Sequence, residues 1–97
     1  MRVHWTNKAL DHLLAIHEYV AQNSEIYANR LVDRLTRRSE QIGLFPESGR
    51  MVPEYKREDI REVIERPYRI IYRVKEAQID VLAVLHSAQQ LPPDMPE

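Results

Sequence analysis

Three strand-like segments follow one another closely in the second half of the chain, at residues 59–64, 66–74 and 79–86. The connections between them are too short for anything but antiparallel hairpins. The middle segment also carries arginines at alternate positions, so that they share one face of a strand. The sequence therefore predicts a small antiparallel sheet with a basic stripe.

The first half of the chain predicts one further strand and two helices. Residues 2–5 alternate like a short strand, and Thr6 is a good N-cap for a helix that runs to about Gln22. Ser24 can cap a second helix, which ends near Gly43. The expected apolar stripes are Ala9, Leu10, Leu13, Ile16, His17 and Val20 on the first helix, and Ala28, Leu31, Val32, Leu35, Ser39 and Ile42 on the second.

These elements predict an α+β fold in which a helical hairpin packs on a four-stranded, mainly antiparallel sheet. The order is strand, helix, helix, strand, strand, strand, and the sequence does not fix the place of the first strand in the sheet. Residues 44–58 are expected to form a loop. Residues 1–88 should form a single domain, followed by a Pro-rich C-terminal tail at 89–97.

Composition narrows the classes of function. The chain has no cysteine, and no apolar run approaches the roughly 20 residues of a membrane span, so we expect a cytoplasmic protein with no membrane partner. No set of His, Asp and Glu residues has metal-ligand spacing, and we expect neither a metal nor a cofactor. The net charge of −1 gives little drive toward nucleic acid.

The sheet has two faces, and the helical hairpin can cover only one. The other face is expected to be an uncovered groove of arginine and apolar side chains, which suits a protein partner better than solvent. The candidate binding residues are Arg50, Arg61, Arg69, Tyr72, Arg73 and His86. If the chain were instead a ribonuclease, Arg61, Arg69 and Arg73 could stabilise the charged phosphate, and His86 could be the acid or base.

Six sequence motifs in the right order resemble the RelE/ParE superfamily of bacterial toxins from type II toxin–antitoxin pairs. They are Trp5 in the first strand, the pattern of residues 9–20 in the first helix, Pro46-Glu47-Ser48-Gly49-Arg50, Ile60-Arg61-Glu62, Tyr68-Arg69-Ile70-Ile71-Tyr72, and His86 at the end of the last strand. Each motif alone is weak, but together they span about 80 residues. The Pro-x-x-Gly-Arg link and the Tyr-Arg-Ile-x-Tyr strand look more like the ParE branch.

This resemblance implies a toxin that inhibits DNA gyrase without catalysis and is neutralised by a cognate antitoxin in a hetero-oligomer. The alternatives are a RelE-like endonuclease that cuts messenger RNA on the ribosome, and a non-toxic binding module of the same fold. RelE-like nucleases have Arg, Lys or Tyr at the extreme end of the last strand, whereas this chain has Ser87, Ala88, Gln89 and Gln90. Glutamine can neither titrate nor neutralise a phosphate, so gyrase inhibition is favoured.

Overall fold

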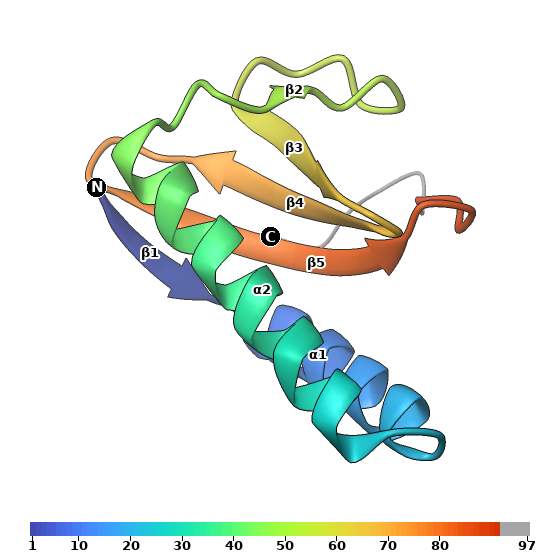
Figure 1. Ribbon diagram of the computed structural model, residues 1–97. Coiled ribbons are helices and arrows are strands. Elements are labelled where there is room, and N and C mark those ends of the chain that lie inside the picture. The colour runs from blue at the N-terminus through green and yellow to red at the C-terminus, as the bar shows by residue number, and fades with distance from the viewer. Residues whose placement is uncertain (92–97) are drawn as a thin grey trace.

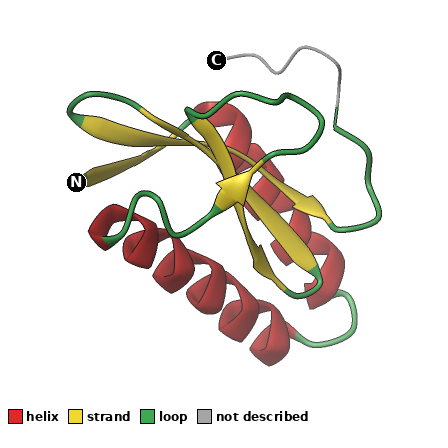
Figure 2. Cartoon of the chain, turned by 90° about the horizontal axis from the view of Figure 1, so that it is seen from above, coloured by secondary structure: helices red, strands yellow, loops and turns green. Residues whose placement is uncertain are grey.

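The computed structural model describes residues 1–91 of the chain. It contains two helices, α1 (Asn7–Ala21) and α2 (Glu25–Leu44), and five strands: β1 (Arg2–Trp5), β2 (Arg50–Met51), β3 (Ile60–Glu65), β4 (Tyr68–Val74) and β5 (Gln78–His86). Both helices lie against one face of a single sheet (Figures 1 and 2). The predicted α+β fold is therefore confirmed, with a fifth strand, β2, inside the region that the sequence predicted to be only a loop.

The strand order in the sheet is β1-β5-β4-β3-β2. The antiparallel hairpins β3–β4 and β4–β5 form its centre, as their short connections require. β1 joins the edge in parallel with β5, a position that the sequence left open. Thr6 secures this edge, because its backbone N–H and its hydroxyl both donate to the carbonyl oxygen of Val81, at 3.1 and 2.7 Å.

Both predicted helix N-caps are confirmed. The hydroxyl of Thr6 accepts a hydrogen bond from the backbone N–H of Ala9 at 3.2 Å, and the hydroxyl of Ser24 accepts one from Tyr27 at 3.1 Å. Each bond satisfies a backbone donor that has no partner within its own helix. Within residues 1–91, neither helix is long and apolar enough to be a membrane span.

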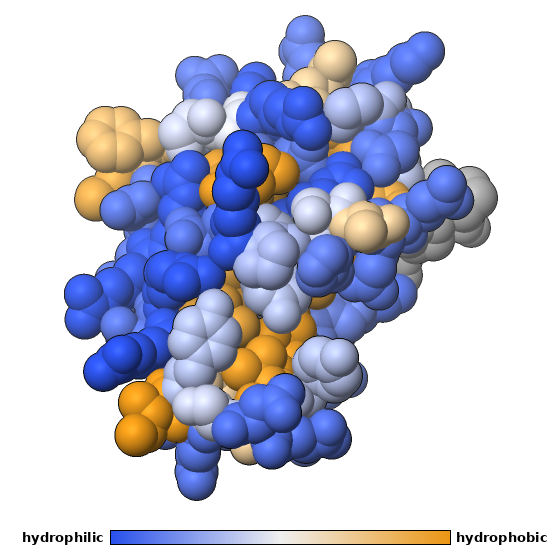
Figure 3. Space-filling view, turned by 45° about the vertical axis from the view of Figure 1, so that its right-hand side comes forward, coloured by the Kyte–Doolittle hydropathy of each residue, from blue (hydrophilic) through white to orange (hydrophobic). Residues whose placement is uncertain are grey.

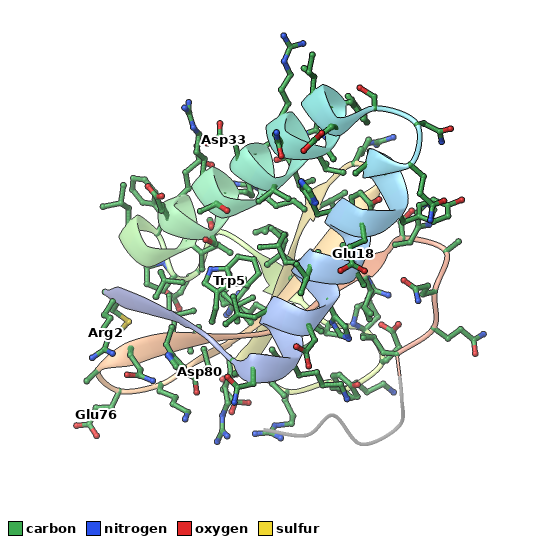
Figure 4. All side chains as sticks on the ribbon, turned by 90° about the horizontal axis from the view of Figure 1, so that it is seen from below. Arg2, Trp5, Glu18, Asp33, Glu76 and Asp80 are labelled. Atoms are coloured by element: carbon green, nitrogen blue, oxygen red, sulfur yellow. The ribbon has the colours of Figure 1, made fainter. Side chains whose placement is uncertain are left out.

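The main core lies between the helices and the sheet. Its buried residues are Ala9, Leu31, Leu35, Ile42, Val63, Tyr68, Ile70, Tyr72, Ile79, Val81 and Val84. Trp5 packs against this core from β1, between the two helices in Figure 4, and its indole N–H donates to the hydroxyl of Ser39 at 3.2 Å. The predicted stripe of α1 was too wide, since Leu10 is exposed and only part of the stripe reaches the core.

The opposite face of the sheet carries a second apolar cluster, so the expectation of an uncovered face is wrong. Its buried residues are Val52, Ile60, Ile71, Leu82, Ala83 and Leu91, with Tyr55 and Leu85 packed against them. Val52 and Tyr55 come from the loop after β2, which folds back over the sheet to shield apolar side chains that the helices cannot reach. Leu91 packs here although it belongs to the predicted tail; residues 92–97 lie outside the described part, so the tail boundary stays a prediction.

We expect Leu35→Ala to lower the free energy of unfolding by about 2–5 kcal/mol, because Leu35 is completely buried and the substitution leaves a cavity. Arg37→Ala is the control on the same helix. Its exposed side chain forms only a surface ion pair with Asp33, and its loss should cost less than about 0.5 kcal/mol. Urea denaturation of both variants measures the difference, and equal effects would contradict the helix orientation described above.

Candidate functional site

A fully buried carboxylate organises the arginines of the sheet. Glu62 on β3 accepts hydrogen bonds from Nε of Arg69 and from Nε of Arg50, each at 2.6 Å. The two terminal nitrogens of Arg69 donate to the carboxylate of Glu54 at 3.1 Å each. Arg69 is itself buried, and its charge is shared between two acids. Its guanidinium group is therefore buried and hydrogen-bonded within the domain, and it is not accessible to a phosphate.

Arg73 lies farther along β4 on the same face as Arg69. Its Nε donates to Asp59 at 3.1 Å, and Asp59 also accepts two hydrogen bonds from Arg57. The hydrogen bonds from Arg57, together with the one from Arg73, hold the pKa of Asp59 below its ordinary value although burial opposes this. The positive charge of Arg73 thus already has a carboxylate partner.

Arg61 and Tyr72 lie on the other face of the sheet, where they hold the segment between α2 and β2. Arg61 donates from Nη1 to the carbonyl oxygen of Gly49 at 2.9 Å. The hydroxyl of the buried Tyr72 accepts the backbone N–H of Gly49 at 3.0 Å and donates to the carbonyl oxygen of Pro46 at 2.8 Å. Burial raises the pKa of Tyr72, which stays a neutral donor at physiological pH.

His86 is exposed at the end of β5, where its ring meets Tyr68 edge to face at 5.8 Å between centroids. Its Nδ1 accepts the backbone N–H of Ala88 at 3.2 Å, which places the proton of the neutral ring on Nε2. His86 pairs with one end of β4, whereas Arg73 is near the other. The two residues are thus separated by about 17 Å along the strand.

The six predicted site residues therefore form separate groups. Arg50 and Arg69 meet at Glu62, Arg61 and Tyr72 meet at Gly49, and Arg73 and His86 each stand apart from both pairs. A nuclease needs an acid, a base and a cation that converge on one phosphate. These residues do not converge in that way. Residues 1–91 also contain no group of three or more His, Cys, Asp or Glu side chains that could hold a metal ion.

Sequence reasoning missed an apolar groove between the two helices. It has a volume of about 530 Å³ and is lined by Leu10, Leu13, Leu14, His17, Asn29 and Val32. His17 and Asn29 close one part of it with a hydrogen bond of 2.7 Å between Nε2 and Oδ1. The sequence contained one sign of this groove: the predicted apolar stripe of α1 was wider than the core can bury. Leu10 and His17 belong to that stripe, but they line the groove and do not enter the core. Figure 3 shows apolar side chains gathered over the helical part of the molecule.

A second exposed apolar surface, formed by two adjacent residues, lies at the C-terminal end of α2. Leu44 and Phe45 are 74 % and 65 % exposed, and they line a shallow hollow with Pro46, Glu47 and Ser48. The sequence signal was two consecutive large apolar residues beyond the predicted end of the helix. Such residues are an unfavourable choice for a solvated loop unless a partner covers them.

We expect the stability of the protein to fall with pH in a way that depends on Glu54. The hydrogen bonds from Arg69 hold the pKa of Glu54 below its ordinary value near 4.5. Stability from this carboxylate is therefore fully present above about pH 5 and is lost as pH falls through the lowered pKa. Urea denaturation between pH 6 and pH 3 should show a shallower loss for Glu54→Gln than for the wild type. Glu47→Gln, which changes an exposed glutamate in the segment between α2 and β2, is the control and should follow the wild-type curve.

Comparison with known proteins agrees with this architecture. Residues 3–91 match the family model described as ParE toxin of type II toxin–antitoxin system, parDE. The chain is 33 % identical over 88 residues to Toxin RelE2 of Caulobacter vibrioides, covering 91 % of this chain and 97 % of that protein. The solved structure of a chromosomal ParDE toxin–antitoxin system from P. aeruginosa superposes with a TM-score of 0.74 at 26 % identity, covering 89 % of this chain and 95 % of that one. The chain therefore belongs to the family of ParE toxins of type II toxin–antitoxin systems.

Proposed function

We propose that this toxin acts by binding and inhibiting DNA gyrase, and that it is not a ribonuclease. The observation that carries the proposal is the internal pairing of the candidate catalytic arginines. Arg69 is buried between Glu54 and Glu62, and Arg73 is bonded to Asp59. Arginines paired in this way offer little stabilisation to the additional negative charge of a phosphate in a transition state.

The alternative is a RelE-like endonuclease that acts on ribosome-bound messenger RNA. The similarity of this chain to Toxin RelE2 supports that alternative. Two features weigh against this alternative. The residues after His86 are Ser, Ala, Gln and Gln, which supply no charged or phenolic group. The net charge of −1 also gives little attraction to the RNA-lined decoding site.

We further propose that the groove between α1 and α2 receives a helical segment of the cognate antitoxin. The groove is concave and almost wholly apolar, and Leu14 on its rim is 60 % exposed. A segment that folds on binding can bury such a surface with leucine-like anchors at helical spacing. Arg61, Arg69 and Arg73 already have carboxylate or carbonyl partners within the toxin, so apolar contact should dominate this interface.

Two assays on one preparation of toxin separate gyrase inhibition from RNA cleavage. We expect the wild type to inhibit supercoiling by gyrase and to leave ribosome-bound messenger RNA intact. His86→Ala should keep its inhibition within a few-fold of the wild type, since His86 would supply at most one contact. For a nuclease in which His86 is the acid or base, the same substitution should lower cleavage about 100-fold. Cleavage without inhibition of supercoiling would overturn the proposal in favour of the endonuclease.

Leu14→Ser should weaken antitoxin binding about tenfold or more, because it removes an apolar anchor from the groove. The control is Ile26→Ser on α2, which removes an exposed apolar side chain that does not line the groove. Titration calorimetry with the purified antitoxin measures both affinities. An unchanged affinity for Leu14→Ser would show that the antitoxin does not use this groove.

A further inference from the structure

The outer edge of β5 is covered by a strand along only part of its length. β1 pairs with residues 78–81, whereas β5 continues to His86 (Figure 1). Beyond β1, side chains accept hydrogen bonds from the backbone of this edge. Nδ1 of His12 on α1 accepts the N–H of Val84 at 3.2 Å, and Oε1 of Gln89 accepts the N–H of His86 at 2.7 Å. A histidine of α1 thus takes the place of a neighbouring strand.

The hydrogen bond from Val84 requires that Nδ1 of His12 carry no proton. In the neutral ring the proton is then on Nε2, and the lone pair of Nδ1 faces the N–H of Val84. In the imidazolium ion both ring nitrogens are donors. Protonation would therefore turn two donors toward each other and leave the N–H of a buried residue without its acceptor.

We propose that His12 is a pH-sensitive contact that holds α1 against the edge of β5 at neutral pH and releases it when the imidazole ring is protonated. Since α1 forms one wall of the groove between the helices, the same protonation weakens antitoxin binding. The link to the antitoxin rests on the function proposed for that groove, whereas the contact between His12 and Val84 does not.

The surroundings of His12 favour the neutral ring. Burial of the half-buried side chain lowers the pKa of His12, and the positive charge of Lys8, one helical turn earlier, lowers it as well. The adjacent Asp11 acts in the opposite direction. The net result is a pKa below the ordinary value of 6.5, so the hydrogen bond to β5 is formed at neutral pH.

The titratable groups of the elements packed against α1 have other contacts. On β5, the carboxylate of Asp80 accepts from Nζ of Lys75 at 2.6 Å. The ring of His86, at the far end of that strand, accepts the backbone N–H of Ala88. The groove residues that α2 turns toward α1 are uncharged. The charge state of His12 is therefore governed by burial and by its neighbours on α1.

The direction of the pKa shift fixes the pH range of the effect. A pKa lowered by folding means that the contact stabilises the folded protein fully above about pH 6.5 and that this stability is lost as pH falls through the lowered pKa. The loss that depends on Glu54 begins only below about pH 5. The two effects can therefore be told apart by the pH at which each begins.

The groove depends on α1 for most of its lining. Four of its residues, Leu10, Leu13, Leu14 and His17, come from this helix and stand on both sides of His12 in the sequence. Leu13 also packs against the main core, so the position of α1 on the sheet and the shape of the groove are linked. Release of α1 at His12 should therefore disturb the wall against which the antitoxin segment packs.

His12→Asn and His12→Leu test the contact. Asparagine can place an acceptor oxygen near the position of Nδ1 but does not titrate, whereas leucine offers no acceptor. NMR follows the titration of His12 and the hydrogen-exchange protection of the Val84 amide between pH 7.5 and pH 5. In the wild type we expect a titration midpoint below 6.5 and a fall in protection of about threefold or more on acidification. Protection should stay constant in His12→Asn and be low at every pH in His12→Leu.

A midpoint of His12 at or above 6.5 would overturn the proposal. The same pH dependence of Val84 protection in the wild type and in His12→Asn would also overturn it. His12→Asn keeps the acceptor, so the test remains decisive even where His12→Leu does not fold.

Titration calorimetry with the purified antitoxin at pH 7.5 and pH 5.5 tests the link to the groove. The quantity measured is the ratio of the wild-type Kd to the Kd of His12→Asn, because the pH dependence of the antitoxin itself cancels in this ratio. We expect the ratio to rise about threefold or more on acidification. An unchanged ratio would overturn the link. If Leu14→Ser shows that the antitoxin does not use the groove, the proposed function fails, whereas the NMR measurements still decide the role of His12.

Discussion

The buried carboxylate of Glu62 is the interaction on which the arrangement of the sheet depends. A carboxylate at 0 % exposure is very costly unless charged hydrogen-bond donors surround it, and Arg50 and Arg69 supply two. Arg69 also forms an ion pair with Glu54, which lies in the loop after β2. This loop is therefore attached to the sheet by an ion pair as well as by the packing of Val52. The arginines of the predicted basic stripe, Arg69 and Arg73, thus form ion pairs within the domain, and Arg69 attaches this loop to the sheet.

Much of the fold followed from local sequence signals. Thr6 and Ser24 cap the helices as predicted, and Leu35 and Ile42 are buried on the expected seam. These features depend on residues close together in the chain, where spacing alone determines which side chains share a face. The central hairpins were predictable for the same reason.

The pairing of the arginines could not be predicted in this way. Glu54 is 15 residues from Arg69 in sequence, and it reaches Arg69 only because the loop between β2 and β3 folds back over the sheet. An irregularity between Ile71 and Tyr72 also changes the register of β4 with β5, which strict alternation does not reveal. Arg69 and Arg73 were therefore assigned to an open face, which in the structure is covered by a second apolar cluster, while the groove between the helices and the exposed pair Leu44 and Phe45 were overlooked.

Satisfying the polar groups inside so small a domain has a consequence for recognition. Within residues 1–91, no buried side-chain nitrogen or oxygen lacks a hydrogen-bond partner. Arg69 and Arg73 are paired to carboxylates, while apolar side chains remain exposed in the groove beside Leu14 and at Leu44 and Phe45. Apolar association depends weakly on salt, whereas phosphate binding weakens steeply as salt rises. The buried charge network thus withdraws Arg69 and Arg73, the two arginines of β4, from phosphate binding.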